Sequence, residues 1–358
     1  MATNATGRRK IVVCKDLGAT AMLLLTDRPD LEVVRWMEDR RCDRAWLLQN
    51  IAGASGVVVC FQDMVINTLS RILTYIRSGP NLRVVSTISV GYEHIDLQVM
   101  AEHKIHVGYT PDILTDAVAD STVMLALMAS RRTDETSSFV KNNQWPDFNW
   151  TPSAFCGPQL STTPFSPTRT VGFLGFGRIA HAVLRRLAGF GVTHCIYTPR
   201  PGAAPQPARD ARLQALHGLV SVAPVDLPAL ARASDVLFVL APGGAQTLHL
   251  VDAAFLRQMK PSGVLVNSGR GAVVDSAALA QALREGWIWG AGLDVLEEEP
   301  HVTAMHALVR EPRCVVLPHL GSAALETRAE MTRLTARNVL AGVLGEPLPV
   351  ALDYSTLV

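Results

Sequence analysis

The stretch that decides the fold is V-G-F-L-G-F-G-R-I-A, residues 171–180. An apolar run with the composition of a buried strand leads into glycines, and a helical pattern begins near Arg178. In the dinucleotide-binding fingerprint G-x-G-x-x-A, the first glycine permits a tight turn. The second lets the backbone approach a pyrophosphate, and the third small residue allows close packing of helix on strand. A strand before it and a helix after it favour this interpretation over an unrelated glycine turn. The predicted cofactor contacts here are Gly175, Gly177, Arg178 and Ile179.

The residues after the fingerprint bear on the choice between NAD and NADP. An NAD site normally has Asp or Glu about 20 residues on, at the end of the second strand, where it binds the ribose hydroxyls. Here that strand ends Y-T-P-R at Arg200, and no acid occurs between residues 148 and 209. A guanidinium binds a 2′-phosphate that an acid would repel. We therefore expect NADPH, with NADH as the alternative, and contacts from Arg200 and Pro201. Arg209 either adds to this site or is solvent-exposed.

Strand and helix patterns alternate along the whole chain, which is typical of parallel sheets with crossover helices. The predicted helices include 44–51, 65–77, 116–131 and a final helix at 325–344, which we expect to return to the first domain. The predicted strands are 10–14, 31–35, 56–60, 83–87 and 106–107 in the first part of the chain, and 170–174, 194–198, 236–240, 264–267, 290–295 and 314–317 in the second.

These patterns predict an α/β protein with two doubly wound parallel-sheet domains, Rossmann-like and flavodoxin-like, with an interdomain cleft. The length of 358 residues fits two domains at about 150 residues each. We expect residues 1–111 and 324–358 to form a substrate domain and residues 112–323 to form a dinucleotide-binding domain. Residues 142–167, rich in Pro, Thr, Trp and Phe, would be an excursion from the sheet with an intersubunit role.

The amino-acid composition excludes some classes of protein and makes others less favoured. Hydrophobic residues make up 48% and charged residues 18%, which excludes a disordered chain. With 33 Lys+Arg against 32 Asp+Glu, no global charge favours nucleic acid or an anionic membrane as a partner. The six cysteines form no C-x-x-C pair and no zinc-type cluster, so we expect reduced thiols and no metal. The first residues lack a secretory h-region and no apolar run spans a bilayer, so a cytoplasmic protein is expected.

Three polar segments directly follow predicted strands of the second domain: V-N-S-G-R-G (266–271), A-G-L-D-V-L-E-E-E-P (291–300) and L-P-H-L-G-S (317–322). The carboxyl ends of parallel strands share one edge, where ligands bind. This edge would therefore hold a cation, an acid and an imidazole. Reduction of a 2-keto acid needs such a set: a guanidinium for the carboxylate and carbonyl, a proton donor, and a carboxylate that keeps the imidazole protonated. Taken singly, each side chain is equally compatible with a structural role.

The combination of G-F-G-R-I-A, N-S-G-R-G, G-L-D-V followed by E-P, and P-H-L-G-S resembles the D-isomer-specific 2-hydroxyacid dehydrogenases, from about residue 10 to residue 349. The longer strings S-T-I-S-V-G-Y-E-H-I-D (86–96), H-V-G-Y-T-P-D-I-L-T-D (106–116) and Y-T-P-R look most like the members that reduce glyoxylate and hydroxypyruvate.

The resemblance implies that Arg270 binds the substrate carboxylate and keto oxygen, that His319 donates the proton, and that Glu299 pairs with His319. Glu297 and Glu298 are not expected to be catalytic. The backbone amides of Val90 and Gly91 would hold the carboxylate, beside a wall formed by the turn at 60–63. The full set of implied substrate contacts is Val90, Gly91, Arg270, Asp294, His319, Leu320, Gly321 and Ser322, and the nicotinamide side adds Pro242, Ser268, Asp294 and Gly321.

Some positions depart from the family pattern. The usual L-T-P loop is P-G-G-A-Q-T-L-H-L here (242–250), and Pro199 precedes Arg200 where relatives have Gly. The excursion resembles the loop by which dimeric relatives embrace a second subunit, so a homodimer is implied. Either Trp145 or Trp150 would enter the neighbour's substrate site, or the loop would serve only as an interface anchor.

The expected function is NADPH-dependent reduction of glyoxylate to glycolate and of hydroxypyruvate to D-glycerate. Two alternatives remain at this level. One is a dinucleotide-sensing protein without catalysis, like the corepressors that share this fold, since a fold does not guarantee activity. The other is a different D-2-hydroxyacid dehydrogenase, acting for example on formate or 3-phosphoglycerate.

Overall fold

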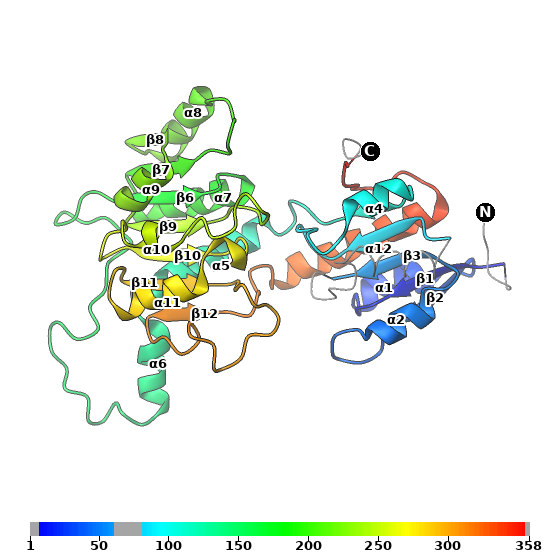
Figure 1. The fold of residues 1–358 in the computed structure, drawn as a ribbon, viewed down its shortest axis with the longest axis horizontal. Helices are drawn as coiled ribbons and strands as arrows, with labels where there is room; N and C mark the ends of the chain where they lie inside the picture. Colours follow the sequence, from blue (N-terminus) through cyan, green and yellow to red (C-terminus); the bar gives the residue numbers. More distant parts are fainter. Residues whose placement is uncertain (1–6, 61–80, 355–358) are drawn as a thin grey trace. The chain divides into compact units, whose positions relative to one another are not determined.

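A computed structural model describes residues 7–60 and 81–354 of the chain. The chain divides into two compact units, Met1–Leu114 with Ala323–Val358, and Thr115–Ser322. Each unit is an α/β structure built on one parallel sheet (Figure 1). The prediction of two parallel-sheet α/β domains is therefore confirmed. The helix predicted at 65–77 and most of the turn at 60–63 lie outside the described residues.

The first unit has a five-stranded sheet in the order β2-β1-β3-β4-β5. Its strands are β1 (Arg9–Val13), β2 (Leu31–Arg35), β3 (Ala54–Val59), β4 (Val84–Thr87) and β5 (His106–Gly108). The helices among its described residues are α1 (Ala19–Thr26), α2 (Arg44–Asn50), α4 (Leu97–Glu102) and α12 (Leu325–Leu344). The terminal helix α12 packs directly on this sheet, as expected. Two glycines allow that close approach, since a Cβ on Gly342 would lie 2.5 Å from a Val84 carbon and one on Gly56 would lie 2.6 Å from a Val343 carbon.

The second unit has a seven-stranded sheet in the order β12-β11-β10-β9-β6-β7-β8. The prediction of six strands was wrong, because β8 (Ser221–Pro224) is short, partly exposed and ends in proline, which suits the edge it occupies. The other strands are β6 (Thr170–Leu174), β7 (His194–Thr198), β9 (Val236–Val239), β10 (Val264–Asn267), β11 (Gly290–Leu293) and β12 (Cys314–Val316).

Helices cover both faces of this second sheet. One of them, α6, was not predicted, since it has no buried residue and therefore little apolar periodicity. The helices are α5 (Thr115–Ser130), α6 (Thr133–Lys141), α7 (Arg178–Leu187), α8 (Pro207–His217), α9 (Leu227–Ala233), α10 (Ala253–Leu256) and α11 (Ser276–Arg284), with short 3-10 turns η1 (Ala188–Phe190) and η2 (Gly271–Val273).

The excursion after α6 contains no helix or extended strand but has a small aromatic core of its own. The Phe148 and Phe155 rings lie 5.4 and 6.2 Å from that of Phe139 on α6, and 5.8 Å from each other. Trp145 and Trp150 are turned outward, with exposed fractions of 66% and 75%. The loop therefore has a local framework that presents two tryptophans to solvent.

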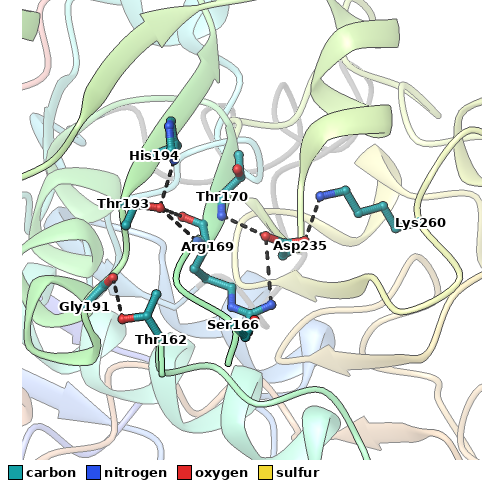
Figure 2. Close-up of polar contacts among 9 residues, drawn as sticks. All are labelled: Thr162, Ser166, Arg169, Thr170, Gly191, Thr193, His194, Asp235 and Lys260. Carbon is teal, nitrogen blue, oxygen red and sulfur yellow. Dashed lines mark hydrogen bonds and ion pairs between the residues drawn. The ribbon is translucent and has the colours of Figure 1, made fainter. Parts of the chain in front are cut away.

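A cluster of polar side chains stabilises the amino-terminal edge of the same sheet through hydrogen bonds and ion pairs (Figure 2). The Asp235 carboxylate accepts the backbone N–H of Thr170 at 2.8 Å and the ammonium of Lys260 at 2.7 Å, and lies 4.0 Å from the Arg169 guanidinium. Thr162, at the end of the excursion, donates to the backbone carbonyl of Gly191. These bonds lie where β6, β7 and β9 begin. This is the edge of the sheet opposite the predicted ligand site.

Within the described ranges, no helix has the length and hydropathy needed to cross a membrane. No disulfide joins the six cysteines, which all lie within these ranges; Cys156 is exposed and the other five are buried.

Candidate functional site

The fingerprint forms the predicted turn between β6 and α7. Gly175 has φ +92°, and a Cβ there would lie 2.6 Å from the backbone nitrogen of Ala241, so only glycine fits. Gly177 caps α7 without any side-chain hydrogen bond, and a Cβ on it would meet no atom within 4 Å. The start of α7 is therefore uncapped by any side chain and accessible, with Arg178 exposed and Ile179 half-buried. This is an arrangement that binds phosphate.

Two hydroxyl groups at the carboxyl edge of this sheet support a bound dinucleotide. Ser268 follows β10 and Thr198 ends β7, and the side-chain oxygens of both are buried without a hydrogen-bond partner among the described residues. Buried hydroxyl groups are nearly always hydrogen-bonded in complete assemblies, so both oxygens fit positions that a polar ligand satisfies. Pro242, also predicted to touch the nicotinamide, is exposed after β9 at the same edge.

At the other end of the expected cofactor site, β7 stops at Thr198, and Arg200 and Pro201 are exposed directly after it. Arg209 is half-buried, and its guanidinium donates to Asp210 at 2.8 and 3.0 Å. Of the two alternatives that the sequence left open, simple exposure to solvent does not apply to Arg209. Arg209 belongs to a partly buried cluster of side chains at the start of α8.

The three consecutive glutamates after β11 each pair with a different histidine. Glu297 lies 2.5 Å from Nε2 of His249, Glu298 lies 3.0 Å from Nε2 of His306, and Glu299 lies 2.7 Å from Nδ1 of His319. The sequence predicted the third pair but neither His249 nor His306. The only available signal for the first pair was a histidine 48 residues before an acidic run, which is weak.

The His319–Glu299 pair is fixed from both sides. Oε1 of Glu299 accepts the backbone N–H of Leu296 at 2.7 Å, while its Oε2 faces His319. The His319 backbone N–H donates to the carbonyl of Asp294 at 2.9 Å, and the residue has φ +56°, an uncommon conformation for a residue other than glycine. Such conformations persist where the surrounding structure requires them, often at active sites. The carboxylate therefore orients the imidazole through Nδ1.

Asp294 organises the turn that follows His319. It is 3% exposed, and its two carboxylate oxygens accept the backbone N–H groups of Leu320 at 2.7 Å and Gly321 at 2.8 Å. Burial raises the pKa of this carboxyl above its ordinary value, although these two bonds oppose the shift. A Cβ on Gly321 would lie 2.8 Å from Oδ2 of Asp294, so this turn also requires glycine. Ser322 is half-buried and ends the turn, and Leu320 is exposed.

Arg270 lies in a tight turn at the end of β10. The Asn267 side chain accepts the backbone N–H of Gly269 and donates to the carbonyl of Arg270, each at 3.0 Å. The backbone of the next residue, Gly271, approaches that of Leu296 so closely that a Cβ would lie 2.0 Å from the Leu296 carbonyl carbon. Because β10, β11 and β12 are neighbours, the structure brings the Arg270, Glu299 and His319 segments together at one sheet edge, as predicted.

Val90 and Gly91 lie in the other unit, on a loop after β4. The hydroxyl of Ser89 donates to the carbonyl of Gly91 at 2.6 Å, and the Thr87 hydroxyl lies 2.8 Å from that of Ser89 and 2.9 Å from Nε2 of the buried His94. A buried side-chain network therefore fixes the conformation of this loop.

The sequence is similar to a family of known proteins over nearly its whole length. Residues 123–321 match the model of the D-isomer specific 2-hydroxyacid dehydrogenase, NAD binding domain. A human protein described as glyoxylate reductase/hydroxypyruvate reductase is 39% identical over 96% of this chain and 97% of its own length. The chain belongs to the D-isomer-specific 2-hydroxyacid dehydrogenase family. It is thus an oxidoreductase whose second unit binds a nicotinamide dinucleotide, in agreement with the uncapped α7 turn and the two unpaired hydroxyls.

Two solved structures are similar to this chain in both fold and sequence. One is an NADPH-dependent glyoxylate/hydroxypyruvate reductase from Sinorhizobium meliloti in complex with NADP and malonate, which is 32% identical with a TM-score of 0.75 over 97% of both chains. Another, the TT0316 protein from Thermus thermophilus, is 31% identical with a TM-score of 0.80 over 96% of this chain and all of the other. Across residues 7–60 and 81–354, no group of three or more His, Cys, Asp or Glu side chains is arranged to hold a metal ion.

Proposed function

We propose that this chain is an NADPH-dependent reductase of small 2-keto acids that converts glyoxylate to glycolate and hydroxypyruvate to D-glycerate. The observation that carries the proposal is the His319–Glu299 pair of 2.7 Å, held at the sheet edge that also carries Arg270. The functions named for the human and Sinorhizobium meliloti relatives support the substrate class.

The roles of the side chains follow from their chemistry. The Arg270 guanidinium binds the substrate carboxylate in a bidentate manner and polarises the keto oxygen. Glu299 is bonded to Nδ1 of His319, and the other ring nitrogen, Nε2, gives its proton to the oxygen as negative charge develops there. The backbone amides of Val90 and Gly91 hold the other side of the carboxylate. When bound, the reduced nicotinamide supplies the hydride that goes to the keto carbon.

The remaining contacts are proposed as follows. The uncapped α7 turn binds the pyrophosphate. The nicotinamide side is lined by Ser268, Pro242, Asp294 and Gly321. The substrate is contacted by Leu320 and Ser322. Arg200 and Pro201 lie at the 2′-phosphate, where an NAD-type acid is missing. The exposed Trp145 and Trp150 support a homodimer in which the excursion docks on a second copy.

The test is the initial rate of nicotinamide oxidation with glyoxylate and hydroxypyruvate, each with NADPH and with NADH. We expect rapid turnover of both keto acids and a preference for NADPH. Equal or better rates with NADH would contradict the cofactor assignment and leave the reductase intact. A protein that binds NADPH but turns over neither substrate would contradict the reductase and favour the dinucleotide-sensing alternative.

A further inference from the structure

An aromatic and charged cluster joins the fingerprint turn to the end of β7. Phe176, the residue between the two fingerprint glycines, stacks on Tyr197 of β7 with ring centroids 4.3 Å apart and an interplanar angle of 13°. The Arg209 guanidinium lies 4.8 Å from the Tyr197 centroid and 5.1 Å from that of Phe176. A cation from α8 is therefore held over a stacked aromatic pair at the strand end that leads to Arg200. Such cation–π contacts are favourable.

The Asp210 carboxylate bonds to both Tyr197 and Arg209. It is 6% exposed, its Oδ2 accepts the hydroxyl of Tyr197 at 2.7 Å, and its Oδ1 accepts Nε and Nη2 of Arg209 at 3.0 and 2.8 Å. The next acid after the fingerprint in the sequence is thus turned inward and bonded through both oxygens. It is not placed to accept the ribose hydroxyls, which is the task of the acid in an NAD site.

The bonds to Asp210 occupy only part of the Arg209 guanidinium. A guanidinium has five N–H donors, and two of them go to this carboxylate. The Arg209 side chain retains 26% of its exposure. By contrast, Arg200 is exposed and makes no side-chain bond to any residue of the described ranges. A guanidinium that is already ordered loses less conformational entropy when it binds a phosphate than a mobile one does.

His181 adds no competing positive charge. Its ring meets the edge of Phe176 at a centroid distance of 4.7 Å, and burial, followed by the Arg209 charge, lowers the pKa of its imidazole. The imidazole is therefore neutral near pH 7, and the positive charge of the cluster belongs to Arg209.

We infer that Arg209 is a second guanidinium for the 2′-phosphate of NADPH, and that Asp210 is a positioning residue that holds it over the Phe176–Tyr197 pair. This inference rests on the proposed NADPH-dependent function. In this arrangement Arg200 and Arg209 approach the phosphate from the two ends of the loop that joins β7 to α8. Specificity for NADPH then depends on a carboxylate that never touches the cofactor.

The test is direct binding to the full-length protein without substrate. Titration calorimetry would measure the Kd of NADPH and NADH, and of adenosine 2′,5′-bisphosphate and AMP, which differ in the 2′-phosphate. The variants are Arg209→Met, Asp210→Asn and Arg200→Met. Arg212→Met is the matched control, because Arg212 lies on the same helix, exposed to solvent, and its side chain bonds to none of the described residues.

We expect Arg209→Met to weaken NADPH and the bisphosphate by about tenfold or more and to change NADH and AMP by less than about threefold, as loss of a charge-assisted bond to phosphate requires. Asp210→Asn should weaken the same two ligands by about threefold to tenfold, less than removal of the guanidinium itself. Arg212→Met should leave all four values unchanged. If Arg209→Met does not fold, Arg209→Lys replaces it, with a smaller loss of the same selectivity expected.

A double variant separates positioning from general stability. Asp210→Asn should have no further effect on the bisphosphate Kd in the Arg209→Met background, because Asp210 acts through Arg209. An unchanged preference for NADPH in Arg209→Met, or equal losses for NADPH and NADH, would overturn the inference while leaving the proposed function in place. A wild-type protein that binds NADH as tightly as NADPH would instead contradict the NADPH assignment itself.

Discussion

Replacement of Gly271 by alanine tests how the Arg270 turn is positioned. A Cβ there would lie 2.0 Å from the carbonyl carbon of Leu296, 2.1 Å from its oxygen and 2.5 Å from the nitrogen of Glu297. All three atoms are backbone, so no flexible side chain gives way. Since nonbonded carbon atoms sit about 3.5–4.0 Å apart, the turn must shift by more than about 1 Å relative to the segment that leads to Glu299.

Two effects follow from that shift. Overpacking costs about 1–3 kcal/mol of unfolding free energy. At about 2–4 °C per kcal/mol for a unit of this size, the Tm falls by about 2–12 °C. Misplacement of Arg270 by about 1 Å should lower kcat/KM with glyoxylate about 10²-fold, whereas NADPH affinity should change little.

The measurements are thermal denaturation, steady-state kinetics and NADPH titration. Gly189→Ala is the matched control, since a Cβ on Gly189 meets nothing within 4 Å. It should leave Tm and kcat/KM at wild-type values. A Gly271→Ala protein with wild-type Tm and kcat/KM would refute the argument that this glycine sets the position of Arg270.

Three further predictions concern the cofactor, pH and stability. Arg200→Met should raise the KM for NADPH by about tenfold or more and leave that for NADH nearly unchanged, and equal increases would refute phosphate binding by Arg200. Burial raises the pKa of Glu297, but the bonds from His249 and the Ser276 N–H outweigh it and lower the net value, while the bond to Glu297 raises the pKa of His249. Stability from this pair is therefore lost as pH falls through the lowered pKa of Glu297 or rises through the raised pKa of His249. Glu297→Gln should lower Tm more at pH 6 than at pH 8.5, by about 1–3 °C because the pair is partly exposed, and an equal decrease at both pH values would contradict this. Asp235→Ala leaves the Thr170 N–H and two cations without their carboxylate, so we expect a loss of about 1–3 kcal/mol in denaturant unfolding with kcat retained, and a change in kcat without loss of stability would count against a purely structural role for this cluster.

Sequence patterns predicted most of the fold, because buried parallel strands are continuous apolar runs. The starts and ends of nearly all strands fall within two residues of the expected positions. The exceptions have physical causes: β8 is an edge strand with one buried residue, and α6 buries none, so neither carries a strong pattern.

The site residues were predicted from strand topology and from the family resemblance, and not from apolar patterns. Arg270, Glu299 and His319 each follow a strand, so the parallel topology alone places their segments at one edge. The resemblance, and not periodicity, distinguished Glu299 from its two neighbours. The pairs Glu297–His249 and Glu298–His306, and the placement of Arg209 over Tyr197, depend on how loops and α8 pack, which no local pattern encodes.

The most direct test of the account compares two histidines that each pair with a glutamate of the same acidic run. The measurement is kcat for hydroxypyruvate reduction by His319→Gln and by His249→Gln at saturating NADPH, in proteins shown to be folded and to bind NADPH. We predict that His319→Gln lowers kcat by about 10²–10⁴-fold, the usual contribution of a general acid, and that His249→Gln retains nearly all of it. Near-wild-type turnover by His319→Gln would contradict the assignment of His319 as the proton donor.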